Sequence, residues 1–179
     1  ISSLRFWRGI HFVFENSGLR CKSVLGQIAI FNRSHYEDII AVRVKKIFPD
    51  PVWKRRYKHV LDFESMLAEE GTVIIKLFLN ISKEEQKKRL ESRLQDPDKL
   101  WKFCMDDLDD RNRWDEFQTA YQDLIEKTST PEAPWYIIPA DRKWYRNLVV
   151  ARLMVEKLRH LQLSLPTPNF DPASIIIPD

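Results

Sequence analysis

The chain has 179 residues, of which 44% are hydrophobic and 31% charged, a balance that suits one folded domain with its own core. Its 29 basic and 26 acidic residues leave a net charge of +3, too small an excess to indicate nucleic-acid binding. No apolar run approaches the roughly 20 residues of a membrane span, and residues 1–10 lack a signal-peptide core. We therefore expect a cytoplasmic protein that binds neither membranes nor nucleic acids.

The first clear elements are a short strand and the helix that follows it. Residues 28–31 form an uninterrupted apolar run, whereas residues 1–26 are ambiguous apart from a possible strand at 11–14. Ser34 and Glu37 have the spacing of a capping box, which predicts that Ser34 caps a helix. A second helix is expected to begin at Asp50 and Pro51 and to end at Gly71.

The rest of the chain alternates between strands and helices. Residues 73–79 are β-branched and nearly all apolar, as in a strand buried on both faces. A capping box at Ser82 predicts a helix that is broken at Asp96 and Pro97. The later elements are a helix from about residue 107, a strand at 135–138 and a helix capped by Asp141. This alternation predicts the α/β class with a parallel sheet.

Polar residues follow each of these strands, at 32–37, 80–83 and 139–143. Ligands of open α/β sheets bind beyond the carboxyl ends of the strands. Helix capping accounts for the serines and the aspartate in these segments without any further function. It does not account for Arg33, which stands between a strand and a cap and whose forked donors suit an anion.

A basic stretch follows the strand at 73–79. Its members are Lys83, Lys87, Lys88, Arg89, Arg93, Lys99 and Lys102. Helical spacing puts Arg89 and Arg93 on one face. Pairs such as Glu84 with Lys88 explain part of this charge as an ordinary solvated helix face. The remainder suits a mobile basic lid over phosphates, so both interpretations remain open.

Several motifs occur together in one order. The longest is residues 26–38, Gly-Gln-Ile-Ala-Ile-Phe-Asn-Arg-Ser-His-Tyr-Glu-Asp. The others are 62–64 before 71–74, 82–86 with Arg89, 96–103 with Asp107, Arg111 and Trp114, and 133–136 through Lys143 and Trp144. Together they strongly resemble the polyphosphate kinase 2 family, in which the longest motif is similar to the Walker-B region. The resemblance covers roughly residues 26–159.

The resemblance implies a three-layer, P-loop kinase-like fold with a parallel sheet and a helical lid. The family-like domain would span 26–162, with its lid at about 83–113, and an extended tail would follow at 163–179. The implied reaction moves a phosphoryl group between inorganic polyphosphate and a nucleoside mono- or diphosphate such as AMP or ADP, or from ATP in reverse, with Mg²⁺. The resemblance also favours a homo-oligomer.

The same resemblance assigns candidate site residues. Arg33 would contact phosphate, and Glu37 would lie near the metal or the nucleotide phosphates. Asn32 stands where many members have Asp, and residues 32–37 are similar to subgroups that phosphorylate nucleoside mono- or diphosphates. The lid residues that would bind substrate phosphate are Arg89, Arg93, Lys102 and Arg111.

One part of the family pattern is missing from the sequence. Family members carry a glycine-rich Walker-A loop with a lysine, but the four glycines here form no G-x-x-x-x-G-K motif. Residues 1–25 also match the family poorly, so we expect an incomplete N-terminal part, through truncation, frameshift or true loss. Because such loops cradle phosphates, the chain alone is expected to be weak or inactive. The alternatives are a non-catalytic polyphosphate-binding or assembly module and another P-loop nucleotide kinase.

Overall fold

The computed structural model of the chain describes residues 9–15, 28–32, 34–161 and Ile175. Arg33, most of the segment 1–25 and all but one residue of the predicted tail therefore lie outside the described residues. For Asn32 the backbone is described and the side chain is not.

The described strands form one sheet in the order β2-β1-β3-β4. They are β1 (Gly9–Glu15), β2 (Ile28–Asn32), β3 (Thr72–Asn80) and β4 (Trp135–Pro139). β3 and β4 pair in parallel, whereas β1 is antiparallel to both β2 and β3. Consequently β2, β3 and β4 run in one direction and their carboxyl ends meet at one edge of the sheet.

The α/β prediction is confirmed, and the parallel pairing of β3 with β4 agrees with it. β1, which includes the possible strand at 11–14, is the antiparallel member of this sheet. A parallel neighbour needs a crossover, which α3 to α5 provide between β3 and β4. The short segment 16–27 between β1 and β2 instead joins strands of opposite direction.

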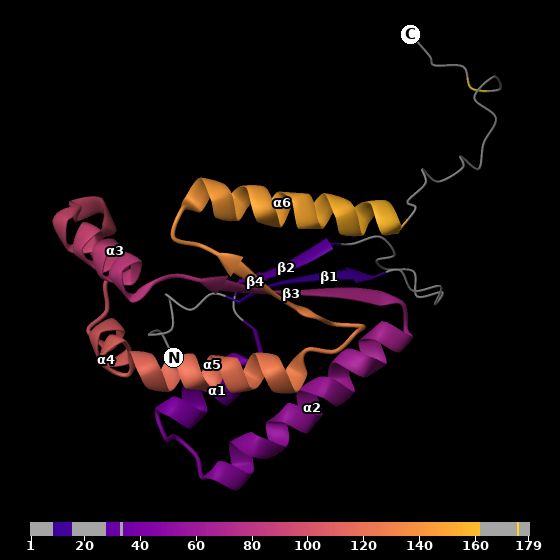
Figure 1. Cartoon of the computed structure of the whole chain (residues 1–179), viewed down its shortest axis with the longest axis horizontal. Helices are drawn as coiled ribbons and strands as arrows, with labels where there is room; N and C mark the ends of the chain where they lie inside the picture. The colour runs from indigo at the N-terminus through magenta and orange to yellow at the C-terminus, as the bar shows by residue number, and fades with distance from the viewer. Residues whose placement is uncertain (1–8, 16–27, 33, 162–174, 176–179) are drawn as a thin grey trace.

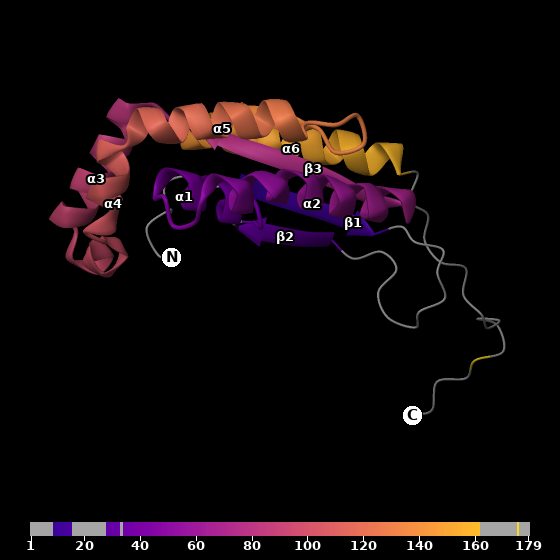
Figure 2. The same ribbon diagram turned by 90° about the horizontal axis from the view of Figure 1, so that it is seen from below.

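Helices cover the sheet on both sides and produce three layers (Figures 1 and 2). On one side lie α1 (Glu37–Val44), α2 (Asp50–Glu69) and α5 (Trp114–Thr128), and on the other lies α6 (Lys143–His160). Among the described helices, none is both long enough and apolar enough to cross a membrane.

The core occupies both faces of β3, because successive side chains of a strand point to opposite faces. Phe78 packs against Tyr121 of α5 at 4.8 Å between ring centres, whereas Ile75 and Leu77, which are fully buried, point to the opposite face. This confirms the prediction that the apolar run at 73–79 is a buried strand. The preceding helix, α2, ends at Glu69, and Gly71 adopts a φ of 83°, a conformation that favours glycine.

A helical arm projects from the sheet at the carboxyl end of β3 (Figures 1 and 2). The arm consists of α3 (Lys83–Gln95), the 3₁₀ helix η1 (Pro97–Lys102) and α4 (Asp106–Asn112). Ser82 Oγ accepts a hydrogen bond from Glu85 N at 3.1 Å, which confirms the predicted cap of α3. The predicted break at Asp96 and Pro97 separates α3 from η1.

Two other predicted caps were wrong. α1 begins only at Glu37, after a turn in which Glu37 N donates to Ser34 O at 3.0 Å, and Ser34 is not its N-cap. Asp141 does not cap α6 either, because its Oδ1 accepts a hydrogen bond from Ser82 N at 2.7 Å. Asp141 therefore links the loop after β4 to the base of the arm.

Candidate anion-binding site at the carboxyl edge of the sheet

A cavity of about 510 Å³ lies between the arm, the carboxyl ends of β3 and β4, and the first turns of α6. Leu79 and Ala140 form its floor at the strand ends. Seven basic side chains line it: Lys88, Arg89, Arg93, Lys99, Lys102, Lys143 and Arg146. This is the edge at which an open α/β sheet binds its ligands.

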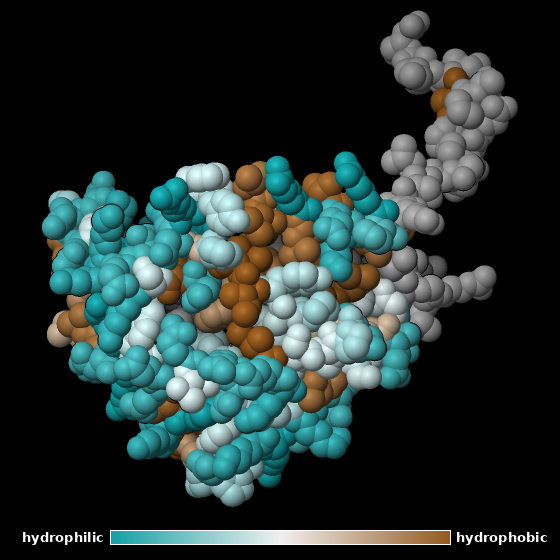
Figure 3. Space-filling view, viewed as in Figure 1, coloured by the Kyte–Doolittle hydropathy of each residue, from teal (hydrophilic) through white to brown (hydrophobic). Residues whose placement is uncertain are grey.

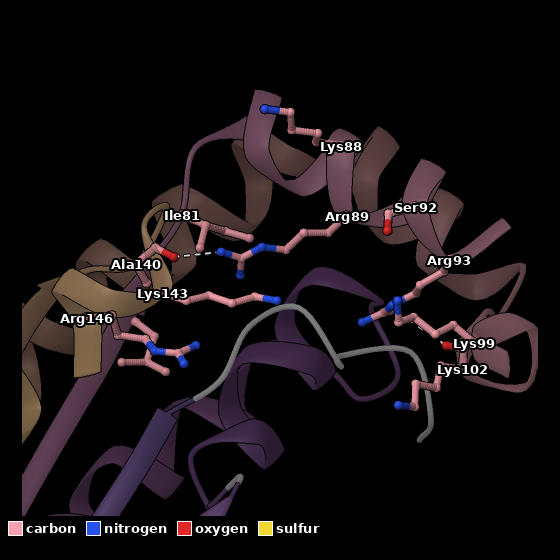
Figure 4. A pocket seen from close by; sticks show the side chains of 11 residues that line it. Ile81, Lys88, Arg89, Ser92, Arg93, Lys99, Lys102, Ala140, Lys143 and Arg146 are labelled. Atoms are coloured by element: carbon pink, nitrogen blue, oxygen red, sulfur yellow. Dashed lines mark hydrogen bonds between the residues drawn. The ribbon is translucent and has the colours of Figure 1, made fainter. Parts of the chain in front are cut away.

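The charge of the cavity has one sign. Among the described residues that line it, none carries a carboxylate. In Figure 4, Lys143 and Arg146 extend from α6 on one side of the cavity, and Arg93, Lys99 and Lys102 extend from the arm on the other. Cations gathered in a concave site focus a positive potential and favour a ligand that carries several negative charges. Figure 3 shows that the surface around α3 is largely hydrophilic, unlike the hydrophobic band between α6 and α5.

Arg89 lines the cavity and also holds the arm to the sheet. Its Nη2 donates to Ala140 O at 2.7 Å (Figure 4). The same Nη2 donates to Asp141 O at 3.2 Å, and Nε donates to Glu85 Oε1 at 2.7 Å. Much of its guanidinium is thus engaged by protein oxygens. Arg89 fixes the base of α3 against the loop after β4.

Arg93 and Lys102 face the cavity from adjacent parts of the arm. Arg93 Nη1 lies 3.4 Å from Lys102 O and 3.5 Å from the buried carboxylate of Asp107. Lys102 Nζ lies 4.9 Å from the ring centre of Trp101, a cation–π distance. These contacts join α3, η1 and α4 into one unit that presents both cations.

Arg111, the fourth residue predicted from the lid, is not among the residues that line the cavity. Its Nη1 donates to Lys83 O at 2.7 Å and to Gln86 Oε1 at 2.8 Å. It therefore holds α4 against the first turn of α3. The structure brings Arg89, Arg93 and Lys102 together around the cavity, whereas Arg111 is not among the residues that line it.

Lys143 and Arg146 are lining residues that the sequence analysis missed. They lie in the first turn of α6, where the helix dipole disfavours cations, and this turn holds no acidic residue. Bringing positive charge to that end of a helix is unfavourable unless an anion offsets it. Cations without acids in the first turn of a helix that follows a strand were therefore a signal that the sequence offered.

The turn between β2 and α1 lies at the same edge of the sheet. Through Ile10 of β1, Asn32 is level with Leu77 of β3, three residues before the end of that strand. Glu37 follows as the first residue of α1. The backbone of Asn32 is thus at the carboxyl edge, where β1 separates β2 from β3 within the sheet. Glu37 follows Tyr36, whose hydroxyl accepts a hydrogen bond from Lys76 of β3.

No group of three or more histidine, cysteine, aspartate or glutamate side chains in the described part of the chain has a metal-binding arrangement. A magnesium ion coordinated mainly by substrate phosphates and water needs only one or two carboxylates from the protein. Glu37, the first residue of α1, is the acidic residue that follows β2 most closely. The described residues therefore suit a metal that arrives with its phosphate ligand.

Comparison with known proteins identifies the family. The family described as Polyphosphate kinase 2 (PPK2) matches residues 20–165. The AMP/ADP-polyphosphate phosphotransferase of Meiothermus ruber is 53% identical over 152 residues, which cover 85% of this chain and 57% of that protein. The ADP-polyphosphate phosphotransferase of Rhodopseudomonas palustris is 37% identical over 153 residues, which cover 79% of this chain and 53% of that protein.

A solved structure shares the fold. The crystal structure of polyphosphate kinase 2 from Arthrobacter aurescens TC1 matches with a TM-score of 0.77 and 48% identity, over 80% of this chain and 51% of that one. The chain thus spans about half the length of these relatives. The resemblance seen in the sequence motifs is confirmed, and the chain belongs to the polyphosphate kinase 2 family.

Proposed function

We propose that the chain is part of a polyphosphate:nucleotide phosphotransferase and that its cationic cavity binds the polyphosphate. The seven basic side chains at the carboxyl edge of the sheet are the observation that carries this proposal. The names of the relatives support it, since they pair polyphosphate with AMP or ADP. The unit responsible is taken as residues 26–162, with 83–113 as a lid that closes over the phosphates.

The proposed reaction is an in-line phosphoryl transfer. An oxygen of the terminal phosphate of ADP or AMP attacks the terminal phosphorus of polyphosphate, and a new P–O bond forms. The bridging P–O bond to the rest of the polyphosphate breaks, and the departing chain is one phosphate shorter. In the reverse direction ATP is the donor. Fixed cations stabilise the charge that develops on the departing oxygen.

The residues divide into three groups in this proposal. Arg93, Lys102, Lys143 and Arg146 hold the polyphosphate, while Arg89 and Arg111 keep the arm in place. Asn32, Arg33 and Glu37 act at the nucleotide phosphates, after the carboxyl end of β2. When bound, Mg²⁺ would neutralise phosphate charge, and Glu37 is the residue proposed to hold it. A cytoplasmic location and assembly into homo-oligomers belong to the same proposal.

A non-catalytic role is the second candidate. The sequence has no G-x-x-x-x-G-K motif, although the loop with that motif normally holds the transferred phosphates. None of the described residues that line the cavity belongs to such a loop, and yet seven of them are cations. A chain of this kind can bind polyphosphate, or join intact subunits, without turning it over.

The experiment separates binding from turnover. Purified chain is titrated with tripolyphosphate by calorimetry and assayed for ATP formation from polyphosphate and ADP, or for ADP formation from AMP. We expect binding that is lost in Arg93→Ala with Lys102→Ala, and turnover far below the roughly 1–100 per second of ordinary kinases. The control, Lys58→Ala with Lys87→Ala, removes equal charge from exposed positions outside the cavity.

Each outcome favours one candidate. Binding with slow turnover supports the phosphotransferase, and binding without any turnover supports the non-catalytic module. Transfer from ATP that ignores polyphosphate would favour another P-loop nucleotide kinase. Failure of the chain to bind tripolyphosphate, or equal loss in the control variant, would contradict both of the first two candidates. Light scattering during size exclusion tests the homo-oligomer.

A further inference from the structure

A closed set of buried hydrogen bonds lies beneath the turn between β2 and α1. Tyr36 Oη donates to Glu64 Oε1 at 2.6 Å, and Lys76 Nζ donates to Glu64 Oε2 at 2.6 Å and to Tyr36 Oη at 3.0 Å. These three residues, here called the buried triad, come from the start of α1, from α2 and from the middle of β3. None of them lines the cationic cavity.

The triad is fully enclosed and satisfied. Tyr36 and Glu64 are each 3% exposed and Lys76 is 0% exposed. The third proton of the Lys76 ammonium goes to Thr128 O at 2.6 Å, at the carboxyl end of α5, where a helix favours a cation. Burial lowers the pKa of Lys76 while the charge of Glu64 opposes that change. Burial also raises the pKa of Tyr36, which keeps its hydroxyl as a donor.

Stability alone is a poor reason for this arrangement. A buried ion pair is often no more stable than apolar side chains of the same size, because both charges must leave water. Lys76 interrupts the apolar run of β3, and apolar side chains in place of both Lys76 and Glu64 would pack without that cost. What the hydrogen-bonded ion pair adds is a fixed orientation of the three side chains, because each hydrogen bond weakens steeply when its angle departs from linear.

The triad holds the turn through Tyr36. Tyr36 directly precedes Glu37, and its ring stacks on His35 at 4.7 Å between ring centres. The described backbone hydrogen bonds of the turn are short-range, such as those from Glu37 N to Ser34 O and from Asp38 N to His35 O. Tyr36 links the turn to Glu64 on α2 and Lys76 on β3, and His35 Nε2 lies 3.9 Å from Glu64 Oε1 beside it.

We propose that Tyr36, Glu64 and Lys76 are positioning residues that fix the turn 34–37, and thus Asn32 and Glu37, relative to the carboxyl end of β3. β3 carries Lys76 at its centre and Leu79 in the wall of the cationic cavity. The triad therefore sets the distance between the nucleotide side of the site and the polyphosphate side. This inference rests on the proposed function, because it assigns the turn to the nucleotide.

The test uses Tyr36→Phe, which removes one oxygen and keeps the ring. Tyr145→Phe on α6, with a 41% exposed side chain, is the matched control. Amide hydrogen exchange is followed at residues 34–44 and in α6, and calorimetry measures the binding of magnesium-ADP and of tripolyphosphate. We expect roughly tenfold faster exchange at the turn and roughly tenfold weaker magnesium-ADP binding, with tripolyphosphate binding and α6 exchange unchanged.

The alternative results are distinct. If exchange accelerates throughout the molecule and both ligands weaken alike, the triad only stabilises the core and the proposal is wrong. If exchange at the turn does not change, the proposal is also wrong. If the natural chain binds neither ligand, the proposed function fails, but the exchange measurement still decides whether the triad fixes the turn. The double variant Lys76→Met with Glu64→Gln, which removes the charges together, should reproduce the local effect.

Discussion

Arg89 donates a hydrogen bond of 2.7 Å to the carbonyl oxygen of Ala140 and thereby fixes the base of the arm to the loop that follows β4. The same loop is bound by Ser82 N, which donates to Asp141 at 2.7 Å. Both contacts join segments that are more than fifty residues apart in the sequence. The wall of the cationic cavity therefore depends on these two hydrogen bonds, here called the latch, which join the base of the arm to the loop after β4.

The first prediction separates this latch from direct phosphate binding. Arg89→Lys keeps the positive charge but loses the fork that reaches two carbonyl oxygens. If the latch is what matters, Arg89→Lys should weaken tripolyphosphate binding about as much as Arg89→Ala does, by roughly tenfold. Calorimetry measures both. Near-natural affinity in the lysine variant would instead make Arg89 a simple phosphate contact.

The second prediction concerns the cations of α6. Lys143→Ala and Arg146→Ala should each weaken tripolyphosphate binding by roughly tenfold, because each removes a charged partner from the cavity. Binding should also lose part of its dependence on salt. The control is Arg152→Ala with Arg159→Ala, exposed positions further along the same helix that line a different hollow. An equal effect in the control would show that only the net charge of α6 matters.

How far the sequence predicted the fold depended on whether the signals were local. The apolar run at 73–79 and the break at Asp96 and Pro97 are local, and the structure has both. The direction of β1 is not local, because antiparallel pairing depends on strands distant in sequence. The cap expected from Ser34 failed because a one-turn bend, which the same residues also favour, comes before α1.

The sequence also predicted only part of the site, namely the cations on the arm. Lys102 was found within a motif of the family and Arg93 through its helical spacing from Arg89 in the region that resembles the lid, and both line the cavity. Lys143 and Arg146 reach that cavity only because β4 ends beside α3, which the order of residues does not reveal. Lys76 was hidden inside an apolar run, and its partner Glu64 lies on a helix whose packing against β3 only the structure shows.

The third prediction is a pH dependence of stability. The hydrogen bond from Arg43, 2.6 Å long, lowers the pKa of Asp123 and links α1 to α5. A lowered folded pKa adds stability above the ordinary aspartate value of 3.8, and this stability is lost as the pH falls through the folded pKa. Asp123→Asn should therefore lower the free energy of unfolding near pH 7 by roughly 0.5 kcal/mol, since the pair is partly exposed.

Thermal unfolding of both proteins between neutral and acidic pH measures this effect. The difference between natural chain and variant should shrink as the pH falls below 3.8, the unfolded pKa of the carboxyl group. A difference that stays constant with pH would mean that the variant acts through packing. Asp62→Asn, whose carboxylate pairs with Lys58 on the exposed face of α2, is the control for a fully solvated pair.

The fourth prediction concerns the stability of the buried triad. Lys76→Met leaves the carboxylate of Glu64 buried without its cation, so the free energy of unfolding should fall by roughly 3–5 kcal/mol. The double variant Lys76→Met with Glu64→Gln removes both charges and should recover most of that loss, because an amide is far cheaper to bury than an unpaired carboxylate. Urea unfolding of the four proteins in this cycle gives the coupling energy of the two side chains. Additive losses would mean that Lys76 and Glu64 act independently and that the short distance between them has no energetic role.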